Sequence, residues 1–136
     1  MLKLIQTDWG KFDLAFDDPA AVDADAAVAT LVYAVLFTDA AGPVERVGDT
    51  WSRRGWWADD TAGAGLWHVR RQPLTDAARR EAEHMIRQAL IERSAALSEV
   101  SVSLVQSSDA AGNVSSVLVD VAGFHNGRKF AIKAAL

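Results

Sequence analysis

Two short runs of alternating apolar and polar residues, LKLIQ and FDLAF, lie near the N-terminus. They flank the sequence TDWGK, in which Gly10 can adopt the positive φ angle of a tight turn. Alternation with a period of two is typical of a strand with one apolar face. The pattern therefore predicts a short β-hairpin at this end of the chain.

A helical pattern follows the sequence DDP, in which Asp18 can cap a helix and Pro19 suits its first position. Apolar residues then recur at i, i+3, i+4, i+7 and i+8, namely Val28, Leu31, Val32, Val35 and Leu36. This spacing predicts an amphipathic helix that ends near Thr38. The sequence DAAGP at residues 39–43 then interrupts regular structure.

The second helical pattern begins after PLTD, where Thr75 is the expected N-cap. One apolar stripe contains Ala78, Ala82, Met85, Ile86, Ala89, Leu90 and Leu97. Charged pairs with i,i+4 spacing are expected on the polar face, namely Asp76 with Arg80, Arg79 with Glu83, and Glu83 with Arg87. The pattern predicts a long amphipathic helix.

Three further segments alternate with a period of two, namely VSVSLVQ, VSSVLVDVAG and RKFAIKAAL. The sequence SDAAGN supplies a turn between the first two, and Val100, Val102 and Leu104 alternate so as to leave one polar face. These segments predict a C-terminal antiparallel β-meander. With two amphipathic helices packed on a mainly antiparallel sheet, the expected fold class is α+β. Residues 1–136 are expected to form a single domain.

Net charge, hydropathy and cysteine content exclude several classes of function. The net charge of -4 argues against a nucleic-acid partner, whose phosphates require a basic surface. No apolar run approaches the roughly 20 residues of a membrane span, and MLKLIQTDWG lacks the apolar stretch of a signal peptide, so we expect synthesis in a cytoplasm. The absence of cysteine excludes disulfides, thiolate zinc sites and cysteine nucleophiles.

The sequence DTWSRRGWWADDTAGAGLWHVRR places four of the five tryptophans of the chain within residues 49–71. Three interpretations remain open: a core corner, an anchor for another protein, and a platform for sugar rings. We expect Trp51 and Trp67 to be buried, with arginines stacked on their faces. Trp56 and Trp57, beside charged residues, are expected to be partly exposed. They form the candidate protein interface together with Arg53 and Arg54.

Candidate catalytic residues are few. Asp59 and Asp60 lie beside the aromatic cluster, but adjacent acids in a glycine-rich loop do not form the two-carboxylate site of a glycosidase. His68, His84 and His125 show no metal-ligand spacing. The sequence GAG at residues 63–65 lacks the lysine of a phosphate loop, and no serine lies in a nucleophile motif. We therefore expect a protein that is not an enzyme and has no metal or cofactor.

The order of elements and several motifs resemble the Mu-type phage tail protein family. The resemblance is carried by FTDA at the end of the first helix, RGWW soon after it, GAGLW next, and PLT at the start of the long helix that precedes the β-meander. Members are small baseplate proteins of contractile tails, related to wedge proteins often called lysozyme-like. Related wedge proteins commonly carry a Glu-Pro-Arg motif near this loop; the matching sequence here is RGWWADD, so no residue role is transferred from that motif.

The resemblance implies a virion structural protein of a contractile phage, a prophage or a tail-like particle. It would be made in the host bacterial cytoplasm and located in the tail baseplate, as one piece of the wedge around the tail tube on which the sheath begins to assemble. Its expected partners are other wedge subunits and the tail sheath, with tail tube proteins as a further candidate. No nucleic acid, membrane or cofactor is implied. A cell-wall glycan hydrolase ranks second, and a carbohydrate-binding module that uses the Trp-rich segment ranks third.

The C-terminal segment RKFAIKAAL adds a second candidate interface. Phe130, Ile132 and Ala134 alternate with Lys129 and Lys133, a pattern that predicts a strand with one buried face. Lysines on an edge strand discourage unwanted pairing. The resemblance implies that the first sheath ring docks on this region, and addition of a strand to the sheet edge is a direct way to dock. Lys129 and Ile132 are the candidate interface residues.

Overall fold

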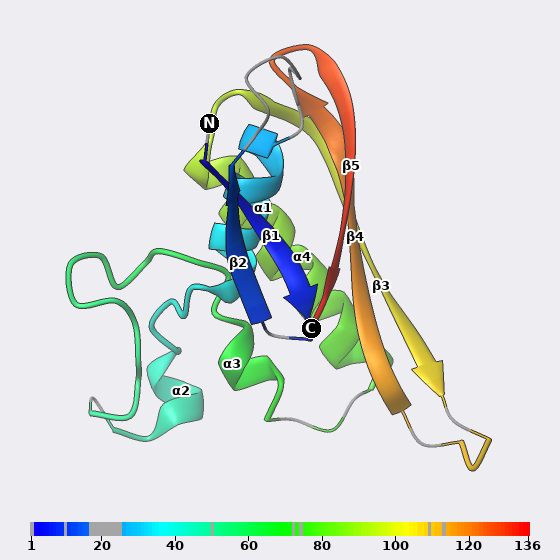
Figure 1. The fold of residues 1–136 in the computed structure, drawn as a ribbon. Helices are drawn as coiled ribbons and strands as arrows, with labels where there is room; N and C mark the ends of the chain where they lie inside the picture. Colours follow the sequence, from blue (N-terminus) through cyan, green and yellow to red (C-terminus); the bar gives the residue numbers. More distant parts are fainter. Residues whose placement is uncertain are drawn as a thin grey trace. The chain divides into compact units, whose positions relative to one another are not determined.

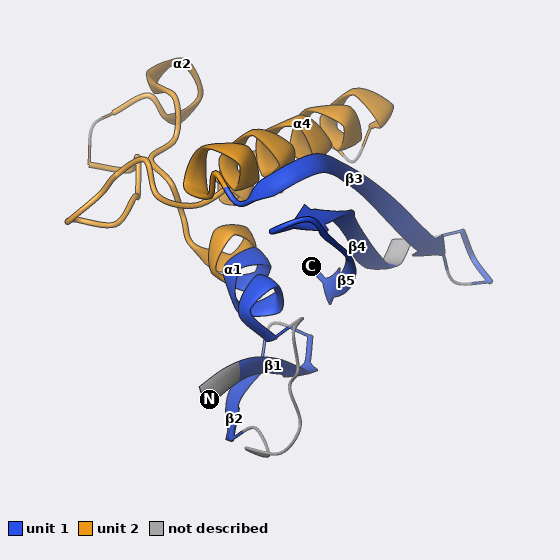
Figure 2. Cartoon of the chain, turned by 90° about the horizontal axis from the view of Figure 1, so that it is seen from above, with its two compact units in different colours: residues 1–33, 96–136 blue, residues 34–95 orange. Residues whose placement is uncertain are grey.

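The computed structural model describes residues 2–9, 11–16, 26–49, 51–71, 73, 75–108, 110–112 and 114–136. The expected turn glycine Gly10 and the expected helix start at Asp18 and Pro19 lie outside these residues. The chain divides into two compact units, shown in different colours in Figure 2. Unit 1 contains Met1–Tyr33 and Ala96–Leu136, and unit 2 contains Ala34–Ala95.

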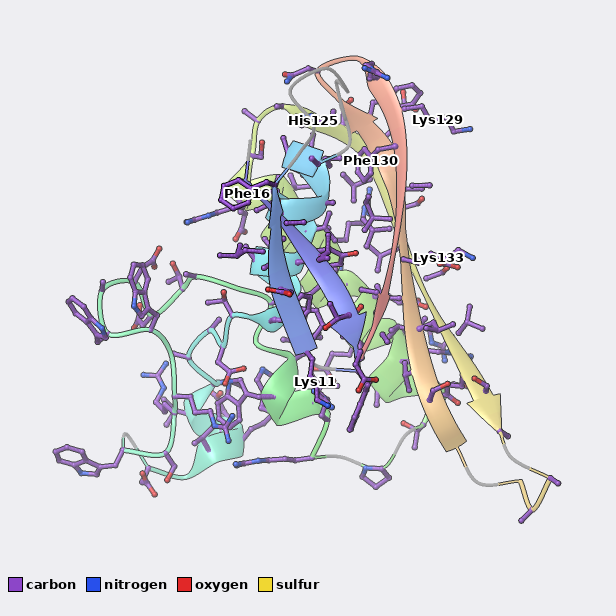
Figure 3. The ribbon with its side chains drawn as sticks, in the orientation of Figure 1. Lys11, Phe16, His125, Lys129, Phe130 and Lys133 are labelled. Carbon is purple, nitrogen blue, oxygen red and sulfur yellow. The ribbon has the colours of Figure 1, made fainter. Side chains whose placement is uncertain are left out.

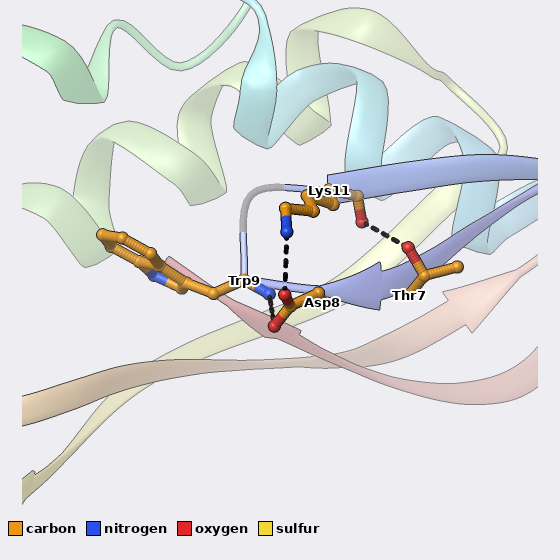
Figure 4. A network of polar contacts seen from close by, with 4 residues as sticks. All are labelled: Thr7, Asp8, Trp9 and Lys11. Atoms are coloured by element: carbon orange, nitrogen blue, oxygen red, sulfur yellow. Dashed lines mark hydrogen bonds and ion pairs between the residues drawn. The ribbon is translucent and has the colours of Figure 1, made fainter.

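The N-terminal part of unit 1 is the predicted hairpin. Strands β1 (Leu2–Asp8) and β2 (Lys11–Phe16) pair antiparallel, with Leu4 opposite Leu14 and Gln6 opposite Phe12. Polar contacts hold its tip: the Asp8 carboxylate accepts the backbone N–H of Trp9 at 2.8 Å and lies 3.2 Å from the Lys11 ammonium (Figure 4). The Thr7 hydroxyl donates to the Lys11 carbonyl at 3.4 Å.

The C-terminal part of unit 1 is the predicted meander. Strands β3 (Leu97–Ser108), β4 (Val114–His125) and β5 (Arg128–Ala135) form one antiparallel sheet in the order β3-β4-β5 (Figure 1). Asn126 and Gly127, with φ angles of 51° and 77°, join β4 to β5 in the two-residue turn that an Asn-Gly pair favours.

One face of this sheet is apolar, as the alternation predicts. Its buried side chains are Val100, Leu104, Val119, Val121, Phe130 and Ala134. The side chains of Ser101, Ser103 and Val105 on the other face of β3 are exposed. An irregularity between Ser98 and Ser101, where Glu99 has a φ angle of 51°, shifts the pairing of β3 with β4.

Helix α1 (Ala26–Phe37) begins in unit 1 and ends in unit 2. Val28, Val32, Val35 and Leu36 are buried, and the helix ends one residue before Thr38, which agrees with the sequence prediction. Within unit 1 the helix contacts the hairpin, since the Tyr33 ring lies 5.4 Å from the ring of Phe12.

Unit 2 contains the predicted long helix and two short ones. Helix α4 (Asp76–Arg93) begins at Thr75, whose hydroxyl accepts the backbone N–H of Ala78 at 3.2 Å. Its buried stripe consists of Ala78, Ala82, Ile86 and Leu90. Helix α2 (Val44–Val47) precedes the Trp-rich residues 49–71, and helix α3 (Leu66–Val69) lies within them.

Three details differ from the sequence predictions. Leu97 does not belong to the apolar stripe of α4, because the helix ends at Arg93 and Leu97 is the first residue of β3. Asp76 forms its ion pair with Arg79, at 2.7 Å, so i,i+3 spacing replaces the expected i,i+4 spacing to Arg80. Helix α3, which lies in the glycine-rich stretch between the two predicted helices, was not predicted. The α+β fold class with antiparallel sheets is confirmed.

Candidate protein-interaction site

The Trp loop, defined as residues 49–65, is fixed by backbone hydrogen bonds to the segment that follows α1. Ala41 N–H donates to the Asp60 carbonyl at 2.6 Å, and Gly42 N–H donates to the Arg53 carbonyl at 2.8 Å. Inside the loop, Asp59 N–H donates to the Trp56 carbonyl at 3.0 Å and closes a turn. The backbone that carries the exposed indoles is therefore held at several points.

The C-terminal end of the Trp loop is fixed by close packing at Gly63. Its φ angle is +97°, and a Cβ atom at this position would lie 2.0 Å from the carbonyl oxygen of Thr38. The next residue, Ala64, donates its N–H to the Val35 carbonyl at 2.9 Å. Only glycine fits this contact without movement of the backbone.

Trp56 and Trp57 lie at the turn inside the loop. Trp57 is 92% exposed and Trp56 is 49% exposed, and their rings meet edge to face with centroids 6.0 Å apart. This exposure agrees with the sequence prediction. Burial of such large rings against a partner releases more water than burial of most other side chains, so exposed indoles are candidate contact residues.

Trp51 is 96% exposed, and the expectation that it would be buried is wrong. The reason is a local turn that the hydrophobic pattern does not report. The Asp49 carboxylate accepts the Ser52 N–H at 2.7 Å and lies 3.2 Å from the Ser52 hydroxyl, so the chain reverses here and Trp51 lies on the turn. A third indole therefore joins the exposed group.

Trp67 is the buried tryptophan, as predicted, with 7% of its surface exposed. Its indole N–H donates to the Ala40 carbonyl at 2.8 Å. The guanidinium carbons of Arg54 and Arg71 each lie 5.0 Å from the centroid of its ring, so the expected arginine stacking is confirmed at this position. Trp67 thus ties the base of the Trp loop to the core of unit 2.

The two candidate interface arginines are engaged within the chain. The Arg53 Nε–H donates to the Gly42 carbonyl at 2.8 Å, and Arg54 forms an ion pair with Asp39 at 3.0 Å. Half of the surface of the Arg54 side chain is exposed. Both side chains hold the loop in place, and their contact with a partner protein stays a prediction.

Asp59 does not have the environment of a general acid. Its carboxylate accepts hydrogen bonds from the Thr61 hydroxyl at 2.7 Å and the Thr61 N–H at 3.1 Å, and it lies 3.8 Å from Arg93. The hydrogen bonds from Thr61, and more weakly the Arg93 charge, lower the pKa of Asp59. A glycosidase acid requires the opposite shift.

The buried His68 belongs to a polar cluster with the partly exposed Arg46 and Glu81, which the sequence did not predict. Arg46 joins the ring Nδ1 of His68 at 3.3 Å to the carboxylate of Glu81 at 2.6 Å. Burial, followed by the Arg46 charge, lowers the pKa of His68. Since arginine can only donate, His68 Nδ1 accepts and the ring is neutral.

Lys129 and Ile132 lie on β5, the last strand of the three-stranded sheet. Figure 3 shows the side chains of Lys129 and Lys133 on the opposite side of β5 from Phe130. Ile132 is opposite Val121 of β4. The Leu136 N–H donates to the Val117 carbonyl, so the backbone groups of Leu136 face β4. In an antiparallel ladder every second residue faces the same neighbour, and the backbone groups of Ile132, four residues earlier, therefore also face β4.

The outward backbone groups of β5 therefore belong to Lys129, Ala131, Lys133 and Ala135. Ala135 is occupied, because the side-chain amide of Gln6 donates to its carbonyl at 2.9 Å and accepts its N–H at 3.0 Å. The Trp9 indole N–H donates to the carbonyl of Leu136. In the described part of the chain, the outward groups of Lys129, Ala131 and Lys133 have no partner.

The hydrogen bonds from the side chains of Gln6 and Trp9 to the end of the chain at Ala135 and Leu136 were not predicted. The sequence contains only a weak signal for them: alternation places Leu4 and Gln6 on the same face of β1, and Gln6 is the polar residue of that pair. Among the described residues, no group of three or more His, Asp or Glu side chains is placed to hold a metal ion. Within the same residues, every helix is too short or too polar to cross a membrane.

Comparison with known proteins places the chain in a phage protein family. The family described as phage protein GP46 matches residues 28–123, which include helix α4, the Trp loop and strand β3, together with most of helix α1 and strand β4. The chain belongs to this family and is a phage protein. No match was found among curated proteins or among solved structures.

Proposed function

We propose that the chain is a structural wedge subunit of a contractile tail baseplate, located beside the tail tube and supporting the start of sheath assembly. Membership of the GP46 phage family supports a phage role. The motifs RGWW, GAGLW and PLT, which resemble those of Mu-type baseplate proteins, narrow the proposal to the wedge. Its role is assembly through protein contacts, without catalysis.

The three exposed indoles of the Trp loop carry this proposal. Trp51, Trp56 and Trp57 are exposed on a loop whose backbone carbonyls at Arg53, Trp56 and Asp60 accept backbone hydrogen bonds. A contact surface fixed before binding loses less conformational entropy when the partner docks. Large aromatic side chains supply much of the binding energy of protein interfaces. The Trp loop therefore suits a neighbouring baseplate subunit.

The free edge of β5 suits a second contact. Lys129, Ala131 and Lys133 direct backbone donors and acceptors away from β4, and an incoming strand can pair with them. The two lysines reduce pairing with unrelated strands. We assign this edge to the first sheath ring, with main-chain hydrogen bonds giving affinity and alternate side chains giving register.

The experiment that tests the proposal is a double substitution, Trp51→Ser with Trp57→Ser, in phage whose tails are examined by electron microscopy. Both side chains are more than 90% exposed, so the purified chain is expected to fold normally by circular dichroism. Tails are expected to lack complete baseplates. The matched control is Val105→Ser, which removes an exposed apolar side chain from β3. Normal baseplates in the double variant, or equal loss in the control, would overturn the proposal.

A carbohydrate-binding role is the second candidate, because exposed indoles also stack on sugar rings. A cell-wall hydrolase is favoured less, since the lowered pKa of Asp59 opposes proton donation. Purified chain incubated with peptidoglycan separates these roles from the baseplate. If the chain sediments with the peptidoglycan and the double variant does not, the carbohydrate role is favoured. Release of soluble peptidoglycan fragments would favour the hydrolase.

A further inference from the structure

A cavity of about 230 Å3 lies within unit 2, apart from the exposed indoles of the Trp loop. It is lined by Arg46, Val47, Trp67, His68 and Arg71. Two of these residues carry full positive charges, and Val47 and the indole of Trp67 supply apolar wall. Among the residues that the structure describes, no carboxylate contributes to the lining.

The positive charge of this cavity is only partly compensated. Arg46 is paired with Glu81, and the nearby Arg54 is paired with Asp39. Arg71 and its neighbour Arg70 differ, because among the described residues neither has a carboxylate within ion-pair distance. Arg71 thus places an uncompensated positive charge at the cavity wall, where it favours an anionic ligand.

Both cavity arginines are held in position before any ligand arrives. Arg46 is fixed between Glu81 at 2.6 Å and His68 at 3.3 Å, and both contacts are made by its Nη1. The remaining N–H donors of its guanidinium are left for a ligand. Arg71 lies 5.0 Å from the centroid of the Trp67 ring, a contact that orients its planar group.

This arrangement matches a carboxylate on a short apolar stem. A guanidinium presents parallel N–H groups to the two oxygens of a carboxylate, and Val47 with Trp67 can cover the methylene groups behind it. The net charge of -4 makes a nucleic-acid phosphate an unfavourable occupant. We propose that the cavity binds an Asp or Glu side chain of a partner protein, with Arg71 as the main contact. Only the location of that partner rests on the proposed baseplate role.

The test is an NMR titration of the purified full chain at constant ionic strength, followed through the indole N–H signal of Trp67. The probe is a blocked Gly-Glu-Gly peptide, and the matched probe is the Gly-Gln-Gly peptide. The glutamate peptide is expected to shift the Trp67 signal in a saturable manner, whereas the glutamine peptide leaves it unchanged. Equal shifts with both peptides, or tighter binding of inorganic phosphate than of the glutamate peptide, would overturn the proposal.

Substitutions test the assignment to Arg71. Arg71→Gln is expected to weaken binding of the glutamate peptide by about tenfold or more, because a charge-assisted fork is lost. Arg71→Lys keeps the positive charge but loses the paired N–H groups of the guanidinium, and it is expected to bind with intermediate strength. This variant also shows whether weaker binding by Arg71→Gln merely reflects loss of the fold. The matched control is Arg128→Gln, which removes the same charge from the start of β5. Equal weakening in the control, or unchanged binding in Arg71→Gln, would rule out the cavity. Failure here leaves the baseplate proposal untouched, since the assay uses the isolated chain.

Discussion

Replacement of Trp67 by alanine is expected to destabilise the fold severely, whereas the same change at Trp51 or Trp57 is expected to have little effect. Trp67 is 7% exposed, and its ring fills the space beside Gly42, where a Cβ atom would lie 2.7 Å from the indole. Loss of a buried tryptophan leaves a cavity that costs about 3 to 5 kcal/mol. A domain of ordinary stability has about 5 to 15 kcal/mol in total.

The hydrogen bond of the indole can be separated from its volume. Trp67→Phe retains an aromatic ring but leaves the Ala40 carbonyl without the donor that now lies at 2.8 Å. An unpaired acceptor in a fully buried site costs about 1 to 3 kcal/mol, and the Ala40 carbonyl is only partly buried, so the lower end of that range is expected. Trp67→Phe is therefore expected to be less damaging than Trp67→Ala. Trp51→Ala and Trp57→Ala, at 96% and 92% exposure, are expected to change stability by no more than about 0.5 kcal/mol.

Urea unfolding followed by far-ultraviolet circular dichroism measures these differences without depending on tryptophan fluorescence. The free energy of unfolding in water, obtained by linear extrapolation, is compared among the variants. The expected order of stability places the two exposed-site variants beside the native chain, Trp67→Phe below them and Trp67→Ala lowest. If Trp51→Ala or Trp57→Ala is as destabilised as Trp67→Ala, the division into one buried indole and an exposed group is wrong.

Two further predictions concern the edge of β5 and the buried histidine. Ala131→Pro removes an outward N–H of β5 and is expected to give folded chain and complete baseplates but few sheaths in electron micrographs; Ile132→Pro removes an inward N–H and is expected to disrupt the sheet. Sheaths of normal number in Ala131→Pro would exclude docking by strand addition. Because the folded pKa of His68 lies below its ordinary value of 6.5, the unfolded chain binds the proton first, and stability is expected to fall as the pH drops through about 6.5. The difference in unfolding free energy between the native chain and His68→Gln, with His84→Gln as an exposed control, measures this contribution; a difference independent of pH would contradict it.

Periodicity predicted the regular elements well, and helices α1 and α4 and the meander each bury apolar residues along one face. The hairpin, helices α1 and α4 and the meander all follow apolar spacings that are visible in the chain. The N-cap at Thr75 was also predictable, since a cap depends on neighbouring residues alone. The end of α4 was not, because Leu97 fits the helical stripe and the strand pattern equally well.

The Trp loop was predicted only in part. Position within the loop suggested burial for Trp51, yet the contacts of Asp49 with Ser52 turn that residue outward. The cluster of Arg46, His68 and Glu81 was beyond sequence reasoning, because its members come from three separate segments and no spacing rule joins them. Short-range hydrogen bonds and long-range polar clusters are the two kinds of contact that hydrophobic patterns do not report.

The edge of β5 shows how one unpredicted side chain limits an interaction surface. Without Gln6, four outward residues of β5 would offer backbone groups to another strand. The Gln6 amide supplies both the donor and the acceptor that a neighbouring strand would supply at Ala135. An incoming strand can therefore pair with β5 only between Lys129 and Lys133, and the two lysines at the ends of this stretch repel basic side chains placed opposite them. Under the proposed docking by strand addition, we therefore expect the edge to accept a short strand with acidic or neutral residues at those positions and to end it at the hairpin.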